Sequence, residues 1–328
     1  MAMYLEGIYG GIGQGLLFAL VAIGIFLTFR VLKSPDLTLE GSFAFGGAIA
    51  MVTLNAGLHF SLVLVLAPLG GALAGLVTGL IHTKLKIDLL VSGLLVTMAL
   101  FSINLYVMNG PTQSAPLSTF VFTPVNQWLV GLGMDAWMAH LTSFIVVGLI
   151  VVSLIITGLT LLFKTSFGLS LRATGSNQVM SQANGVNTDV TKISLLVLAN
   201  AIIALAGVLV VQQQAGASVQ SGSGVLVIGL GALVLAEAFT PQNASIFKRL
   251  CLIVFGASLY FSIVAMVILS GVIDTNGTRL LQALIALFAL ALPKLQYTPQ
   301  VMKFKAMVKN RRDVKSKSVV VKKVGEQG

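Results

Sequence analysis

The residues that could perform chemistry are few and widely spaced in this chain. Of 328 residues only ten are acidic, three are histidine and one, Cys251, is cysteine. The sequence has no Gly-x4-Gly-Lys-Ser/Thr phosphate loop, and its short loops hold no Ser/His/Asp or Cys/His arrangement. A lone cysteine supplies neither a disulfide nor a Cys/His metal site. We therefore expect no catalytic residue, no metal and no cofactor.

The most distinctive polar segment is 164–192, which is too long for a simple connection between two helices. Within it Ser176 can cap a short helix, and Gly185 can adopt the left-handed conformation that ends one. A two-turn helix outside the membrane is unstable alone, so the pattern predicts a peg that docks into a partner's groove. The alternative is a helix lying on the lipid surface, but such helices usually carry basic residues and this one has none. The residues of the predicted peg are Ser176, Asn177, Gln178, Val179, Met180, Ser181, Gln182, Ala183, Asn184 and Gly185, with Val179, Met180 and Ala183 on its apolar face.

The elements around this segment are apolar stretches long enough to cross a bilayer. The chain is 56% hydrophobic and 9% charged, with a mean hydropathy of +0.98, which exceeds what one soluble core could bury. A crossing needs about 20 apolar residues. We expect an all-α polytopic membrane protein with about nine transmembrane helices. The expected crossings are 8–29, 39–57, 60–82, 88–108, 138–163, 193–213, 223–240, 250–270 and 278–292.

The basic residues fix the expected orientation, because lysine and arginine gather in cytoplasmic loops. With the N-terminus outside and the C-terminus cytoplasmic, nineteen of the twenty basic residues fall on the inner side, and Arg279 alone lies outside. Residues 1–293 would form the membrane domain, and 294–328 a disordered basic cytoplasmic tail. We expect this tail to touch anionic lipid headgroups and assign it no nucleic-acid partner, although the net charge is +10.

Two expected crossings, Leu39–Gly57 and Ser223–Thr240, are short and glycine-rich, and each opens with a small polar run. They are five crossings apart and so run in opposite directions. The sets 39–108 and 223–292 are therefore a candidate inverted repeat, and interrupted segments at matching positions point to a solute path. The alternative is that short spans tilt less or pack at the periphery.

Polar residues inside the spans are the candidates for that path. Glu237 should face protein or water, because a charge at a helix centre costs about 2.5–3.5 kcal/mol; alternatively it turns to the inner surface toward Lys248 or Arg249. The uncharged residues either line the path or bond neighbouring helices. Gln212, Gln213 and Gln214 close the sixth span on the outer side. They either surround the opening where the solute is received or mark the hydrated end of the helix. The candidate path residues are Ser42, Ser92, Thr97, Asn104, Asn200, Gln212 and Glu237.

Two glycine stripes predict close helix packing. Gly7, Gly11 and Gly15 recur at intervals of four residues, and so do Gly71, Gly75 and Gly79. Small residues at this spacing let two helices approach closely, within the chain or across a dimer.

Three phrases resemble a known family. Gly168-Leu-Ser-Leu-Arg-Ala-Thr-Gly175, with Asn177 and Gly185-Val-Asn-Thr-Asp189, is similar to the cytoplasmic loop of permeases in ATP-binding-cassette (ABC) importers for branched-chain amino acids and ribose. Within that branch, 34–43 and 96–105 resemble a subgroup of tryptophan/tyrosine transport permeases. The resemblance covers most of residues 5–293.

The resemblance implies a division of labour. A separate ABC ATPase would hydrolyse ATP on the cytoplasmic side, and an extracellular or periplasmic solute-binding protein would deliver the solute. The peg would be the coupling helix, and two copies would form one pathway in a bacterial cytoplasmic membrane. An amino acid of the tryptophan/tyrosine kind is the expected solute. The alternatives are an ABC permease for a sugar or nucleoside, or an ion-driven secondary transporter, which usually needs ionisable groups deep in the membrane.

Overall fold

The computed structural model describes residues 2–116, 120–241, 243–271 and 277–296 and is mostly helical in that part of the chain. The elements are α1 (Ala2–Phe26), the π-helix η1 (Leu27–Leu32), α2 (Thr38–Asn55), α3 (Phe60–Lys84), α4 (Leu89–Val107), β1 (Thr112–Gln113), α5 (Thr123–Gly131), α6 (Ala136–Lys164), α7 (Ser166–Ser176), α8 (Gln178–Ala183), α9 (Thr188–Gln213), β2 (Ala217–Ser218), α10 (Val225–Ala238), α11 (Ile246–Leu269) and α12 (Thr278–Gln296). Most of the predicted tail 294–328 lies outside the described residues.

The prediction of an all-helical polytopic membrane protein is confirmed in its coarse form. Six helices of the described chain are long and apolar enough to cross a bilayer: Glu6–Leu32, Phe60–Lys84, Leu89–Val107, Ala136–Lys164, Thr188–Gln213 and Ile246–Leu269. Helices α2, α10 and α12 occupy the other three predicted crossings. At 14 residues, α10 spans only about 21 Å, short of the hydrocarbon layer of about 30 Å. A small antiparallel pair, β1–β2, was not predicted.

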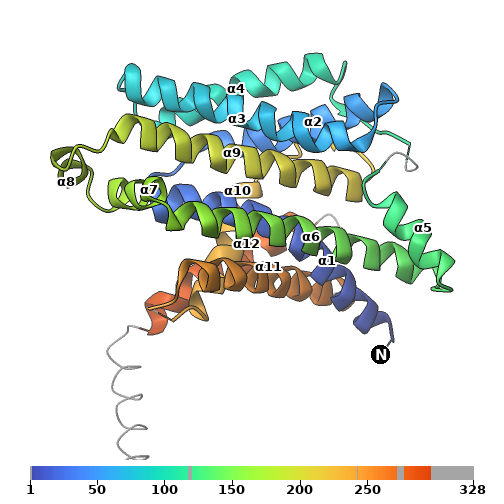
Figure 1. Ribbon diagram of the computed structural model, residues 1–328. Helices are drawn as coiled ribbons and strands as arrows, with labels where there is room; N and C mark the ends of the chain where they lie inside the picture. The colour runs from blue at the N-terminus through green and yellow to red at the C-terminus, as the bar shows by residue number, and fades with distance from the viewer. Residues whose placement is uncertain (1, 117–119, 242, 272–276, 297–328) are drawn as a thin grey trace, which may run out of the picture.

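The helices run side by side, and their connections gather at two opposite ends of the bundle (Figure 1). Helices α7 and α8 lie at one end, while α5 and the N-terminus lie at the other. Helix α5 and β1 both belong to the long connection between α4 and α6, where β1 pairs with β2.

Helices α1–α4 and α9–α12 form two halves of the bundle. The long first helix of each half, α1 or α9, packs against the other half. Helix α1 lies mainly along α11 and also contacts α10, whereas α9 lies mainly along α3 and α2. Helices α2, α3 and α4 pack among themselves, and so do α10, α11 and α12. The two halves are therefore interlocked rather than placed end to end.

The two glycine stripes lie at the interfaces of α1 with α11 and of α3 with α9. A Cβ at Gly11 would sit 2.9 Å from the Cα of Ser262 on α11, and one at Gly15 would overlap Ser258. On α3, a Cβ at Gly75 would overlap the carbonyl oxygen of Leu196 on α9. Only residues without a side chain permit so close an approach. The predicted close packing is confirmed within one chain.

Candidate functional site

The two short helices meet at their N-terminal ends. At the start of α2, the carbonyl oxygen of Glu40 lies against Gly222, where an added Cβ would overlap it. One carboxylate oxygen of Glu40 accepts a hydrogen bond of 3.1 Å from the backbone N–H of Gly224, the residue that precedes α10. The two polar runs that the sequence singled out are thus in direct contact.

A carboxylate serves the N-terminus of each short helix. The first backbone N–H groups of a helix lack partners inside it and carry partial positive charge. Oδ1 of Asp36 accepts from the N–H of Thr38 at 2.8 Å, and Glu40 satisfies Gly224. Gly224 has φ +82°, a left-handed conformation that glycine adopts freely, and it has no side chain with which to cap the helix. Glu40 therefore takes over the capping of α10 from a different helix.

Behind this junction lies a closed polar network. Asn200 on α9 donates to Oδ2 of Asp36 at 2.9 Å and accepts from the Ser42 hydroxyl at 2.6 Å, and all three side chains are buried. Asp36 lies in the turn before α2, where removal from water raises the pKa of its carboxyl, and hydrogen bonds from Thr38 and Asn200 oppose that rise only in part. The candidates Ser42 and Asn200 therefore tie helices together in this structure.

A cavity of about 360 Å³ opens beside the junction, between α2, α4 and the segment 219–223. Glu40, Thr97 and Asn104 line it. The Thr97 hydroxyl donates to the carbonyl of Leu37 at 2.8 Å. Asn104 is 1% exposed, yet neither its amide nitrogen nor its amide oxygen has a hydrogen-bond partner. A buried amide is normally paired, so this one has spare capacity for a molecule that enters the cavity.

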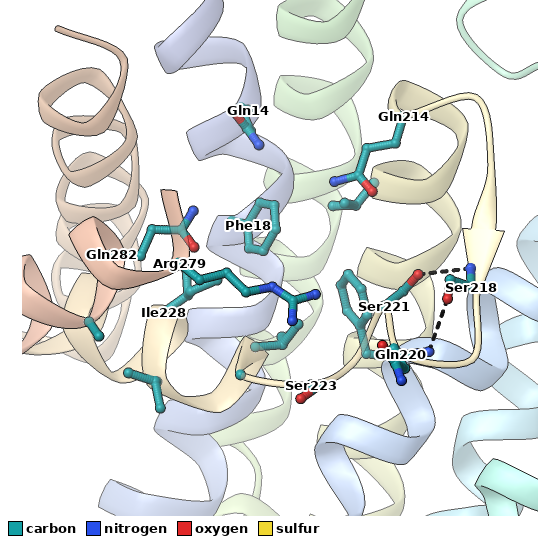
Figure 2. Close-up of a pocket in the computed structure, with 16 residues that line it drawn as sticks. Gln14, Phe18, Gln214, Ser218, Gln220, Ser221, Ser223, Ile228, Arg279 and Gln282 are labelled. Atoms are coloured by element: carbon teal, nitrogen blue, oxygen red, sulfur yellow. Dashed lines mark hydrogen bonds between the residues drawn. The ribbon is translucent and has the colours of Figure 1, made fainter. Parts of the chain in front are cut away.

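A second cavity of about 500 Å³ lies on the other side of the same segment (Figure 2). It is formed by α1, the end of α9, the start of α10 and α12. Gln220 and Ser223 line both cavities, so the connection between β2 and α10 separates them. Arg279 reaches into this second space.

Two further candidate path residues lie elsewhere. The hydroxyl of Ser92 is buried and donates to the carbonyl of Asp88 within its own helix at 2.9 Å. Gln212 is buried, and its side-chain oxygen accepts from the N–H of Val121 at 2.8 Å. Gln212 thus holds the α4–α6 connection, whereas Gln214 lines the larger cavity.

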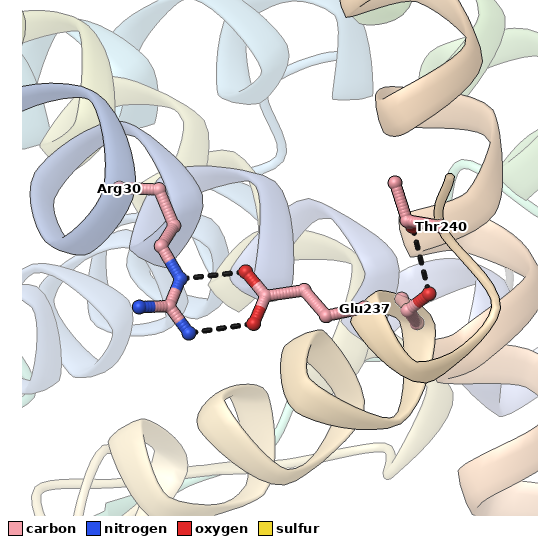
Figure 3. A network of polar contacts seen from close by, with 4 residues as sticks. Arg30, Glu237 and Thr240 are labelled. Atoms are coloured by element: carbon pink, nitrogen blue, oxygen red, sulfur yellow. Dashed lines mark hydrogen bonds and ion pairs between the residues drawn. The ribbon is translucent and has the colours of Figure 1, made fainter. Parts of the chain in front are cut away.

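Glu237 has a partner other than the one expected. Its carboxylate binds Arg30 of η1 in a bidentate pair with N–O distances of 2.6 and 2.5 Å (Figure 3). Of the two predicted arrangements, the turn toward Lys248 or Arg249 is not the one found: Glu237 pairs with Arg30, and Arg249 donates to the carbonyl of Ala244. The two partners are 207 positions apart, so no local pattern could indicate the pair.

The segment 164–192 forms two helices rather than the one predicted. Ser176 is the last residue of α7 and not the cap of the peg; Asn177 caps α8, its side-chain oxygen accepting from the N–H of Met180 at 3.0 Å. Gly185 has φ +80°, as predicted for the residue that ends the helix. Val179 and Met180 are 76% and 64% exposed, at the end of the bundle where α8 projects.

Helix α7 connects α8 to the bundle. It packs against η1, where a Cβ at Gly175 would overlap the carbonyl oxygen of Val31. The hydroxyls of Thr174 on α7 and Thr191 on α9 share a buried hydrogen bond of 2.9 Å. A displacement of α7 must therefore reach η1 and α9 directly, because no side chain separates α7 from the η1 backbone.

Sequence reasoning missed Asp36, Arg30 and the cavity around Arg279. Asp36 stands two residues before the helix that begins at Thr38, and an Asp side chain commonly accepts a hydrogen bond from the backbone N–H two residues on, so the sequence alone could have indicated this contact. Arg30 and Arg279 were read only as markers of orientation. In the part of the chain that the structure describes, no cluster of His, Cys, Asp and Glu could hold a metal ion.

Comparisons with known proteins agree on one family. The sequence pattern of the family described as "Branched-chain amino acid transport system / permease component" matches residues 7–290. The chain is 30% identical to a tyrosine transport system permease protein of Clostridioides difficile, over 88% of this chain and 91% of that one. It is 29% identical to a probable branched-chain amino acid transport permease, LivH, of Methanocaldococcus jannaschii, over 60% and 63% of the two chains. It is also 29% identical to the autoinducer 2 import permease LsrC of Yersinia enterocolitica, over 56% and 48%.

Among solved structures, PsaBC from Streptococcus pneumoniae in complex with Fab has a similar fold. The TM-score is 0.50, and the match covers 92% of this chain and 94% of the other at 14% sequence identity. At that identity the match concerns the arrangement of helices alone.

Proposed function

Because the chain belongs to the family of branched-chain amino acid transport system permease components, we propose that it forms the solute path of an ATP-driven importer for an aromatic amino acid. Its relatives are transport subunits, and the chain is accordingly a multi-pass membrane permease and not an enzyme. The aromatic solute is supported by the tyrosine permease, whose similarity extends over nearly the whole of both chains. The similarity to LsrC keeps other small solutes within the family's range.

We place the chain in a bacterial cytoplasmic membrane with nine crossings, the N-terminus outside and the C-terminus inside. Two observations support this orientation: α7 and α8 gather at the end opposite the N-terminus, and the loops on that side carry the basic residues. The interlocked packing of α1–α4 with α9–α12 supports an inverted repeat, each half beginning with the long helix that precedes the segments 39–108 and 223–292.

The residues from Ser176 to Gly185 would couple the bundle to a separate ATPase subunit. The supporting observation is that α8 exposes two large apolar side chains at its tip while Ser181 faces inward. Exposed apolar groups on a short helix stable only through its neighbours suit a groove in a partner. The basic end of the bundle is where an ATPase would have access.

A continuous set of contacts would carry the ATPase movement to the cavities. Helix α7 meets η1 at Gly175; η1 carries Arg30; Arg30 holds Glu237 on α10; and the start of α10 holds Glu40. Rigid helices joined by a few discrete contacts can exchange one packing arrangement for another. In this proposal the junction of α2 and α10 is the part that changes, and the Asn104 cavity lies on the solute path.

Two copies of the chain would form one pathway, and a binding protein on the outer side would deliver the solute. The cavity beside α4 supports the first point, because it is open in the single chain and a second copy would close it. The selectivity of such a system would lie largely in the binding protein.

Co-purification with the ATPase subunit tests the coupling role. Replacing Val179 and Met180 with Asp should abolish the complex, because charged groups cannot enter an apolar groove without a partner. The matched control is Leu132→Asp, which makes the same change at an exposed position at the opposite end. Retention of the ATPase by the double variant would remove α8 from the coupling interface.

A further inference from the structure

The larger cavity has an exposed arginine on its wall, Arg279. Among the described residues that line it, Arg279 alone is charged. The guanidinium extends into the middle of the space, with Gln14 and Phe18 of α1 on one side and the Ser218–Ser223 segment on the other (Figure 2). A volume of about 500 Å³ is within the range of small-molecule sites.

Arg279 has no ion pair within the described part of the chain, where the pair between Arg30 and Glu237 is the one salt bridge found. It is also the second residue of α12, where the partial positive charge of a helix N-terminus makes a cation unfavourable. An arginine in such a position adds to the field of the helix instead of cancelling it. Both contributions favour an anionic group in the cavity.

The uncharged lining suits a small polar molecule with an apolar part. The side-chain amides of Gln14, Gln214 and Gln282 line the cavity and make no hydrogen bond within the described residues. Phe18 and Phe43 form an apolar base, with ring centroids 6.2 Å apart. Arginine binds a carboxylate with two parallel hydrogen bonds, and amides can complete the shell of the bound group.

We propose that the Arg279 cavity binds the carboxylate of an amino-acid solute on its way through the permease. The inference rests on the proposed function and adds to it the contact that recognises the solute. Arg279 supplies the bidentate partner, Gln214 supplies further hydrogen bonds, and the two phenylalanines receive the apolar side chain. A phosphate of an anionic lipid offers the same chemistry to Arg279, so the test separates the two sources.

The neighbouring cavity provides a contrast within the same protein. Its one charged lining residue in the described part of the chain is Glu40, so the connection between β2 and α10 separates a cationic space from an acidic one. A cysteine in the Arg279 cavity should therefore react faster with an anionic reagent, and a cysteine in the Glu40 cavity should react faster with a cationic one.

The first experiment measures the charge of the cavity. In a Cys251→Ala background, Gln282→Cys is treated with methanethiosulfonate reagents that carry either a sulfonate or a trimethylammonium group. We expect the ratio of anionic to cationic rates to fall about tenfold when Arg279→Gln is added. Gln14→Cys provides a second position if Gln282→Cys does not fold. Phe101→Cys in the acidic cavity is the control, and its ratio of anionic to cationic rates should not change when Arg279→Gln is added.

The second experiment identifies the anion. The complete transporter carrying Gln282→Cys is placed in phosphatidylcholine nanodiscs, with or without phosphatidylglycerol, and labelled in the presence of L-tyrosine or tyramine. Tyrosine should slow labelling at least about fivefold, and tyramine, which lacks the carboxylate, should not. Equal protection by tyramine overturns the inference. Protection that follows phosphatidylglycerol and ignores tyrosine assigns the site to lipid phosphate and also overturns it.

Failure of this site can be told from failure of the proposed function. The same purified variant is assayed for its ATPase subunit, which Arg279→Gln should leave bound because Arg279 lines the cavity between α1, α9, α10 and α12, whereas α8 projects from one end of the bundle (Figure 1). A bound ATPase with no charge effect at Gln282→Cys rejects the carboxylate site alone. A charge effect without any ATPase partner rejects the importer.

Discussion

Two buried asparagines illustrate the difference between a region that holds the helices together and a region that could bind a ligand. Asn200 on α9 makes hydrogen bonds to Asp36, Ser42 and its own helix, and no polar atom of its side chain is left over. Asn104 on α4 is equally buried and makes none. The same residue type thus performs opposite tasks, and the difference is whether a neighbouring helix or a cavity faces the amide.

The same contrast extends to the surroundings. Around Asn200, α3 and α9 approach through glycines until backbone meets backbone. Around Asn104, the start of α2 and the segment before α10 leave a cavity that is lined by this unpaired amide. Close-packed interfaces resist small displacements, whereas a junction held by a few hydrogen bonds can rearrange.

Asn200→Leu should have the largest effect on stability. The substitution leaves one oxygen of Asp36 and the Ser42 hydroxyl buried without partners, at a cost of about 3 kcal/mol or more. We expect a clear fall in the thermal unfolding temperature of the purified protein in detergent. An unchanged unfolding temperature would mean that the network does not hold the helices.

Gly75→Ala should have the next largest effect, because its Cβ would overlap the backbone of α9. Overpacking of this kind costs about 1–3 kcal/mol. The matched control is Gly158→Ala on α6, where no atom lies within 4 Å of the new Cβ. The two variants are compared by thermal unfolding; equal stability of both would contradict the close approach of α3 and α9.

Removing the pair between Arg30 and Glu237 should change stability by less than about 1 kcal/mol, since the side chains are 48% and 35% exposed. If the pair transmits movement from η1 to α10, ATP-driven uptake should nevertheless fall in Glu237→Gln. The double exchange Arg30→Glu with Glu237→Arg should restore part of it. Full uptake by Glu237→Gln would exclude the pair from the coupling path.

Asn104→Leu should have the smallest effect on stability, or even a favourable one, because it removes two buried atoms that lack partners. Solute uptake should fall by about fivefold, corresponding to the loss of roughly one hydrogen bond to the solute. Unfolding temperature and uptake are measured on the same preparation. A variant that transports normally would place the solute path away from this cavity.

Much of the fold could be predicted because a bilayer imposes it. Each predicted crossing corresponds to a helix, and the glycine stripes indicated close packing before any partner helix was known. The short polar openings of two spans pointed to the place where α2 and α10 meet. Local rules were also misleading. Serine is a common N-cap residue, but Ser176 is the last residue of α7, and Asn177 is the N-cap of α8.

The candidate sites could be predicted only in part. Thr97 and Asn104 were selected as polar residues inside a span, and both line one cavity. Ser42 and Asn200 were selected for the same reason, yet they bond to each other. The type of a side chain determines which groups it can bind. Which partner it finds depends on the segments that pack against it, and for Ser42 and Asn200 these lie 158 positions apart in the sequence.

By itself the sequence determined the class of the protein, the course of its helices and the absence of an ATP-binding loop. These properties follow from composition and from backbone hydrogen bonding, which a helix satisfies within its own segment. Tertiary structure alone decided that Glu40 caps α10, that Arg30 holds Glu237, and that Arg279 is left facing a cavity. Each of these depends on which helices lie side by side, and that is fixed by packing along the whole chain.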